Sequence, residues 1–130
     1  MNLLVDSTVW IDLFRGRETG QTAKLEHAVK NGDLICYCGF IFTEVLQGIR
    51  DEKQYVATKR EFETLVYLED ERSTFDLGAT IYRDLKRKGL TIRNSIDCLI
   101  TAIAIQHDVS LLENDRDFHF IGEHYPLKLI

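Results

Sequence analysis

Short apolar segments of strand length alternate along this chain with longer segments of helical periodicity, and this alternation constrains the fold more than any other feature. Strands are predicted at residues 2–6, 34–38, 110–112 and 126–130. Helices are predicted directly after the first strand, with Ser7 or Thr8 as the cap, and at residues 22–31, 40–49, 51–67, 74–88 and 94–107. Because parallel strands need a crossover helix between them, this order predicts an α/β sandwich of three layers, with a short, mainly parallel sheet flanked by helices.

A single domain over residues 1–130 is expected, because the chain contains one proline and no segment that resembles a linker. With 45% hydrophobic residues, it can bury a full core. The apolar stretches at 34–49 and 96–105 are interrupted by Glu44 and Asp97, and both are shorter than the ~20 residues that cross a bilayer. No signal peptide is recognised near the N-terminus, so no membrane association and a cytoplasmic location are expected.

Three lone acids lie in apolar surroundings. Asp6 ends the run Leu3–Asp6, Glu44 lies within residues 40–46, and Asp97 lies within residues 96–100. Burial of an unpaired carboxylate costs several kcal/mol, so such an acid is normally paired, protonated or bound to a metal ion. These positions therefore indicate a functional site.

A fourth acid, Asp115, follows the predicted strand at 110–112. Asp6 and Asp115 both come after the carboxyl ends of strands, where parallel sheets bind ligands. Each acid also has a simpler interpretation: Asp6 and Asp97 can cap helices, and Glu44 and Asp115 can face solvent. The coincidence of all four favours a shared site.

Clustered carboxylates without a neighbouring histidine or cysteine favour Mg²⁺ or Mn²⁺. Two such ions about 4 Å apart clamp the attacking and leaving oxygens of an in-line phosphoryl displacement, so no serine or cysteine nucleophile is needed. The four histidines are scattered along the chain and are assigned structural or surface roles. No Walker loop or G-x-G-x-x-G motif is present, so these nucleotide-binding sites are not supported.

The net charge of −5 argues weakly against a nucleic-acid partner, unless bound cations neutralise the acid site. Basic residues are also clustered. Arg93 precedes the Asp97 helix and is a candidate for contact with a substrate phosphate or with an acid, and Lys86, Arg87 and Lys88 are candidates for contact with an RNA backbone.

Four segments together resemble the PIN-domain toxins of VapBC toxin–antitoxin pairs: 4–11 (LVDSTVWI), 43–48 (TEVLQG), 96–104 (IDCLITAIA) and 114–118 (NDRDF). The resemblance covers nearly the whole chain. It implies a PIN-like fold, an endoribonuclease that depends on Mg²⁺ or Mn²⁺, and structured RNA such as tRNA as the substrate. It also implies a cognate VapB-type antitoxin that inhibits the enzyme, and a homodimer.

By position, Asp6, Glu44 and Asp97 match the three core acids of that family, and Asp115 matches the more variable fourth, with Asp117 as an alternative ligand. Two departures stand out. Ser7-Thr8 replaces the usual Thr-Ser or Thr-Asn but keeps both side chains polar. Glu113 replaces a usual Thr or Ser and adds negative charge beside the site.

A catalytically silent PIN-like interaction module is the main alternative, although the intact core acids argue against it. A receiver-type phosphotransfer domain needs an acidic pair after the first strand and a lysine after a late strand, and Lys128 lies within a predicted strand instead. A haloacid-dehalogenase phosphatase needs Asp-x-Asp, where this chain has Asp6-Ser7-Thr8.

Overall fold

The computed structural model describes all 130 residues. Its strands are β1 (Asn2–Val5), β2 (Leu34–Tyr37), β3 (Val66–Tyr67) and β4 (Ser110–Leu112). Its helices are α1 (Ser7–Phe14), α2 (Gly20–Lys30), α3 (Gly39–Gln47), α4 (Glu52–Glu63), α5 (Arg72–Arg87), α6 (Ser95–Gln106) and α7 (Arg116–Gly122). The strand order is β3–β2–β1–β4 and every pairing is parallel, which confirms the predicted α/β class.

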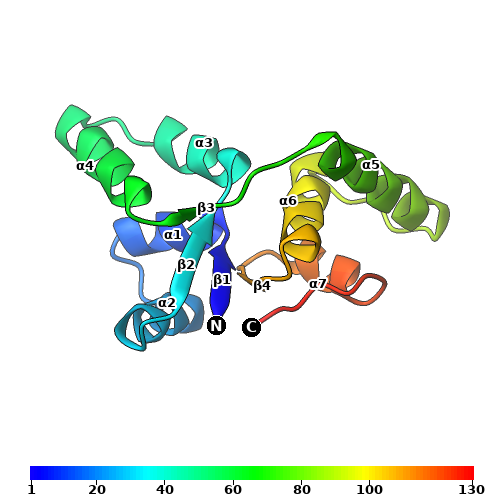
Figure 1. The fold of residues 1–130 in the computed structure, drawn as a ribbon, viewed down its shortest axis with the longest axis horizontal. Coiled ribbons are helices and arrows are strands. Elements are labelled where there is room, and N and C mark those ends of the chain that lie inside the picture. The colour runs from blue at the N-terminus through cyan, green and yellow to red at the C-terminus, as the bar shows by residue number, and fades with distance from the viewer.

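Helices cover the sheet on both sides (Figure 1). Helices α1 to α4 lie on one side of the strands, and α5, α6 and α7 lie on the other. This arrangement gives the expected three layers, because each βα connection returns the chain over one face of the sheet. No helix has the length and apolar character that a membrane crossing requires.

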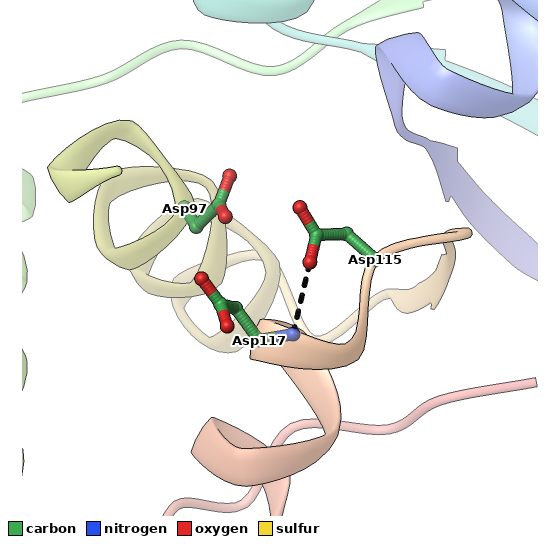
Figure 2. A group of neighbouring side chains, drawn as sticks. All are labelled: Asp97, Asp115 and Asp117. Atoms are coloured by element: carbon green, nitrogen blue, oxygen red, sulfur yellow. Dashed lines mark hydrogen bonds between the residues drawn. The ribbon is translucent and has the colours of Figure 1, made fainter. Parts of the chain in front are cut away.

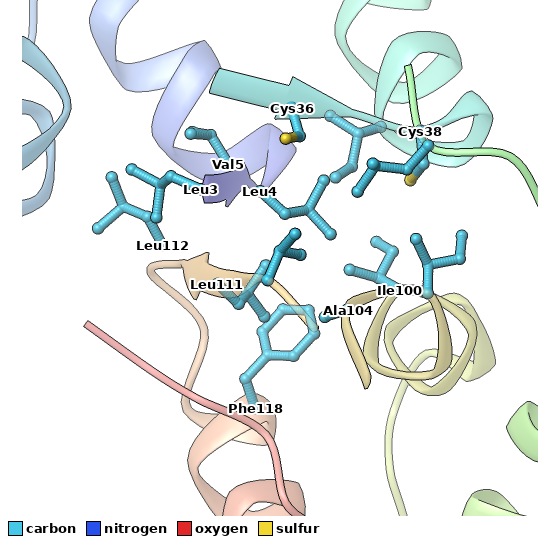
Figure 3. Packing of buried hydrophobic residues seen from close by; sticks show 14 of the residues in the cluster. Leu3, Leu4, Val5, Cys36, Cys38, Ile100, Ala104, Leu111, Leu112 and Phe118 are labelled. Atoms are coloured by element: carbon cyan, nitrogen blue, oxygen red, sulfur yellow. The ribbon is translucent and has the colours of Figure 1, made fainter. Parts of the chain in front are cut away.

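The core is built around β1, the central apolar strand of the sheet. Leu3, Leu4 and Val5 are fully buried, as expected for a parallel strand that is covered on both faces. Figure 3 shows these side chains packed between the neighbouring strands, α6 and Phe118 of α7. Each such side chain contributes about 1.5–3 kcal/mol through burial. The well-packed core therefore holds in place the C-terminal ends of β1 and β4 and the first turn of α6.

Helix α6 packs closely along α5. A Cβ atom on Gly78 of α5 would lie 2.5 Å from Cδ2 of Leu99, so this position requires glycine or a shift of the leucine. This close contact holds α6 in place against α5 and so determines where the backbone of Asp97 lies.

The register places the ends of β1 and β4 side by side. Val5 pairs with Leu112, and the Asp6 N–H donates to the Leu112 carbonyl at 2.9 Å. The residues that follow these two strands therefore begin at the same edge of the sheet, as the sequence predicted for Asp6 and Asp115.

One predicted helix, residues 51–67, is wrong in its last four residues. Helix α4 ends at Glu63, and the Thr64 hydroxyl donates to the Glu61 carbonyl at 2.7 Å. Val66 and Tyr67 then pair with Cys36 and Tyr37 as the edge strand β3. A two-residue strand has too few residues to show a period of two, so the preceding helical pattern concealed it.

The C-terminal region also differs from the prediction. Residues 126–130 form no strand and contribute only an isolated bridge between Leu111 and Leu129. The polar run around Asp115 begins the unexpected helix α7, with Asp115 as its cap. At the other end of the chain, Asp6 caps α1, where Ser7 or Thr8 was expected.

Candidate active site

Asp6 lies where β1 ends and α1 begins. Its side chain is 3% exposed, and its Oδ2 accepts hydrogen bonds from the Thr8 hydroxyl at 2.8 Å and the Thr8 N–H at 3.4 Å. Burial nevertheless raises the pKa of Asp6 above its ordinary value, and repulsion from Asp115 adds to the effect. Asp6 is thus both a helix cap and a buried acid beside other acids.

Asp97 occupies the first turn of α6. Asn94 caps this helix through the Ile96 N–H at 3.0 Å, so Asp97 is not needed as the cap. Asp97 is 8% exposed, and no donor of the chain reaches its carboxylate. Burial, followed by repulsion from the surrounding acids, raises its pKa to about 7. At neutral pH this group is therefore about half protonated, and no positively charged side chain pairs with it.

Asp115 and Asp117 lie at the start of α7. The Asp117 N–H donates to Asp115 Oδ1 at 3.0 Å, which fixes one carboxylate against the backbone of the other residue. Figure 2 shows these two side chains and Asp97 facing a common space. One carboxylate oxygen from each of the three residues lies within 4.8 Å of the other two. Helix α6 and the start of α7 thus bring three carboxylates close enough to share one ligand.

Glu44 completes the predicted set from α3. It is half-buried, and its pKa is raised by burial and by repulsion from Asp6, while a hydrogen bond with Ser7 partly opposes the rise. Glu44 also contributes to the raised pKa of Asp97. It belongs to the same electrostatic site but lies outside the tight group of three aspartates.

Arg93 supplies the positive charge nearest to the cluster. Its Nη2 donates to Asp115 Oδ1 at 2.9 Å, and its Nε donates to Asp117 Oδ2 at 3.3 Å. These contacts raise the pKa of the guanidinium above its ordinary value, with Asp117 as the largest cause. Of the two partners that the sequence allowed for Arg93, the structure shows the acids.

Glu113, which stands out in the sequence only as a departure from the family pattern, is a further buried acid of this region. Its side chain is 1% exposed, and its Oε2 accepts from the Asp115 N–H at 2.7 Å while Oε1 lies 2.8 Å from His119 Nε2. Burial raises its pKa, and the Asp115 N–H and His119 oppose the rise. Glu113 therefore orders the loop that carries Asp115. The role of His119 was missed, because only the unexpected turn into α7 brings it back to Glu113.

The donor set of this cluster suits a hard divalent cation. The group of possible ligands consists of Asp97, Asp115 and Asp117, so every ligand atom is a carboxylate oxygen and no cysteine or histidine takes part. Burial, followed by repulsion from the surrounding acids, raises the pKa of Asp97, and a cation between the acids would offset that repulsion. The residues present therefore fit a hard divalent cation.

Comparison with known proteins places this architecture in context. The family model described as the PIN domain matches residues 3–123. The VapC ribonuclease Mb1587 of Mycobacterium bovis and the ribonuclease VapC11 of Mycobacterium tuberculosis are each 33% identical to this chain over 124 residues. Each alignment covers 92% of this chain and 91% of the relative.

Solved structures show the same fold. VapBC2 from Rickettsia felis, bound to a DNA fragment from its promoter, contains a chain that matches with a TM-score of 0.78 at 21% identity, over 100% of this chain and 98% of that one. VapBC-1 from nontypeable Haemophilus influenzae matches with a TM-score of 0.76 at 19% identity, over 100% and 97% of the two chains.

Proposed function

Because this chain belongs to the PIN-domain family, among the VapC ribonucleases, we propose that it is the toxin of a toxin–antitoxin pair and hydrolyses RNA at the acid site. The observation that carries the proposal is the convergence of Asp97, Asp115 and Asp117, with carboxylate oxygens within 4.8 Å of one another. A cluster of this kind is costly to the fold and is explained by a cation that takes part in the reaction.

We assign the catalytic acids as Asp6, Glu44, Asp97 and Asp115. The same four residues, together with Asp117, would hold Mg²⁺ or Mn²⁺. In support, Asp6, Glu44 and Asp115 all contribute to the raised pKa of Asp97, so each lies within electrostatic reach of Asp97. Bound in this site, the cation would lower the pKa of an attacking water and balance charge on the phosphoryl group and the leaving 3′ oxygen.

The chain's own residues prepare the site for that chemistry. Thr8 fixes Oδ2 of Asp6, and Glu113 fixes the backbone of Asp115, so both acids are oriented before substrate arrives. The low exposure of Asp6 and Asp97 limits competing water. In the hydrolysis, the oxygen of water forms a bond to phosphorus, the bond between phosphorus and the 3′ oxygen breaks, and the proton lost by the water ends on that 3′ oxygen, so no covalent enzyme intermediate is required.

Exposed cations, one of them in contact with the acid site, support RNA as the substrate. The Arg93 side chain is 63% exposed, and its Nη1 donates to no group of the chain, so this nitrogen is available to a substrate phosphate. Arg83, Lys86 and Arg87 of α5 are exposed and form no ion pair. These side chains offer contacts to a phosphate backbone despite the net charge of −5, and a structured RNA such as tRNA suits them.

The partners follow from the proposed role as a toxin. We propose that a VapB-type antitoxin binds and inhibits the enzyme, and that the toxin acts in the cytoplasm, where its RNA substrates are. We also propose a homodimer. In its support, Val56 of α4 and Val66 and Tyr67 of β3 are exposed apolar side chains, each at least 39% exposed.

The test is cleavage of total tRNA and of bulk RNA by the purified protein with Mg²⁺, with Mn²⁺ and with EDTA. We expect cleavage with either ion, none with EDTA, and none by Asp97→Asn at matched secondary structure. Asp108→Asn is the matched control, since Asp108 is an exposed acid paired with Lys128, and asparagine tolerates its φ of 52°. Full activity of Asp97→Asn would reject the site. A wild type inactive on all RNA would favour the interaction module.

A further inference from the structure

Arg93 connects the loop before α6 to the start of α7. Three of its nitrogens are used: Nη2 on Asp115, and both Nε and the backbone N–H on Asp117, the last at 3.2 Å. The side chain is 63% exposed and yet makes both contacts with acids of the cluster. Because the guanidinium donates to two neighbouring carboxylates, its geometry is more closely defined than that of an unpaired surface charge.

The contacts involve only one oxygen of each acid. Asp115 Oδ1 accepts from Arg93 Nη2 and from the Asp117 N–H, while Asp115 Oδ2 accepts no hydrogen bond. Asp117 Oδ2 accepts from Arg93 Nε and from the Arg93 N–H, while Asp117 Oδ1 accepts none. Each carboxylate is thus fixed by one oxygen and keeps the other for a further ligand.

Two roles for Arg93 make opposite predictions about cation binding. If Arg93 is only a counter-ion, it repels the divalent cation, and its removal must strengthen cation binding. If Arg93 orients the two carboxylates, its removal must weaken cation binding, because ligands that lose an outer partner typically lose about 10- to 100-fold in metal affinity. The sign of the change therefore separates the two roles.

The hydrogen bonds favour orientation. Nε and Nη2 form one edge of the planar guanidinium, and they reach two different residues from that single edge. We infer that Arg93 is a positioning residue of the metal site: its guanidinium holds one oxygen of Asp115 and one of Asp117, and thereby sets the second oxygen of each for the divalent cation. This inference rests on the proposed function, which requires that cation.

Calorimetric titration with Mn²⁺ alone, without RNA, tests the inference on wild type, Arg93→Met, Arg93→Lys and Lys86→Met. We expect Arg93→Met to weaken Mn²⁺ binding by about tenfold or more. Arg93→Lys keeps the charge but not the planar pair of donors, so it should restore less than half of that loss on a logarithmic scale. Lys86→Met removes an unpaired cation that contacts no acid, and it should leave the affinity unchanged or slightly tighter.

The outcomes separate this inference from the function on which it rests. Unchanged or tighter Mn²⁺ binding by Arg93→Met would overturn the positioning role, as would full recovery in Arg93→Lys. A wild type that binds no Mn²⁺ and cleaves no RNA would instead reject the proposed function. The Arg93 N–H contact with Asp117 survives in both variants, and thermal unfolding with EDTA shows whether each one is folded.

Discussion

Asp97 and Asp117 belong to one cluster and are both almost fully buried, at 8% and 4% exposed, but only Asp117 has a positively charged partner. Asp117 accepts hydrogen bonds from two nitrogens of Arg93, whereas Asp97 accepts none from the chain and has a pKa raised to about 7. Asp6 and Glu44 also have raised pKa values, while Asp115 shares Arg93 with Asp117. The site thus has an unbalanced half, Asp6, Glu44 and Asp97, and a balanced half, Asp115 and Asp117.

The two halves are therefore expected to contribute differently to cation binding. The balanced half is ordered before any cation arrives, because Arg93 and the start of α7 hold it. The carboxylates of the unbalanced half are buried and repel one another, and only a cation or a proton relieves that repulsion. A cation bound in the proposed site would therefore gain binding energy mainly by relieving repulsion in the unbalanced half, and it would meet carboxylates already held by Arg93 in the balanced half.

The largest expected effect compares one acid from each half in RNA cleavage. Asp6→Asn should lower the rate of metal-dependent cleavage by about 100-fold or more, because it removes a buried charge from the proposed cation site. Asp115→Asn keeps an acceptor for Arg93 and should lower the rate by only about tenfold. Single-turnover rates at saturating Mn²⁺ measure both, with Asp108→Asn as the control. Equal losses in the two variants would break the distinction between the halves.

The next effect is the pH dependence of cation binding. Because the pKa of Asp97 is about 7, a proton competes with the cation below that pH. Mn²⁺ affinity measured by calorimetry should fall by up to about tenfold per pH unit as the pH drops from 7 to 6, and should level off above pH 8. In Asp97→Asn the affinity is lower, and its slope between pH 6 and 8 should be small. A slope that persists in this variant would assign the proton to another acid.

Stability without metal should change in opposite directions for the two halves. The folded-state pKa of Asp97 lies above its ordinary value of 3.8, so the folded protein binds more protons and loses stability as the pH rises from about 4 to about 7. Asp97→Asn removes this loss, and at pH 8 with EDTA it should be more stable than wild type by about 1–2 kcal/mol. The gain should disappear near pH 4.

Asp117→Asn is the matched variant of the balanced half. It loses charge-assisted bonds to Arg93, and its free energy of unfolding should fall by about 1–3 kcal/mol at pH 8. Thermal or urea unfolding of both variants with EDTA gives the two signs. Destabilisation by Asp97→Asn at pH 8 would indicate that this residue serves the fold rather than the reaction.

The sequence supports much of this site but not its division into halves. Asp6, Glu44 and Asp97 were recognisable because each interrupts an apolar segment, a local signal that needs no knowledge of tertiary contacts. The contacts of Arg93 with Asp115 and Asp117 cross more than twenty residues and depend on how α7 starts. That helix was not predicted, since the charged residues Asp115 to Asp117 at its start also suit a solvated turn.

The fold shows the same limit. Strands β1, β2 and β4 were predicted because continuous apolar runs mark buried parallel strands. The edge strand β3 consists only of Val66 and Tyr67, both exposed, and its identity depends on pairing with β2 rather than on a pattern of its own. Segments set by their own periodicity were thus predictable, and those set by a distant partner were not.

The smallest expected effect lies outside both halves, on the exposed cations of α5. Lys86→Met and Arg87→Met should each raise the KM for RNA about two- to threefold at unchanged kcat, because these side chains form no ion pair and are available to phosphates but not to the reacting atoms. Each variant should also reduce the salt dependence of RNA binding by about one in the slope of log K against log salt, while Mn²⁺ affinity stays the same. Binding to a labelled tRNA in EDTA across a salt series measures the slope. A fall in kcat instead would place α5 closer to the acids than this division of the site allows.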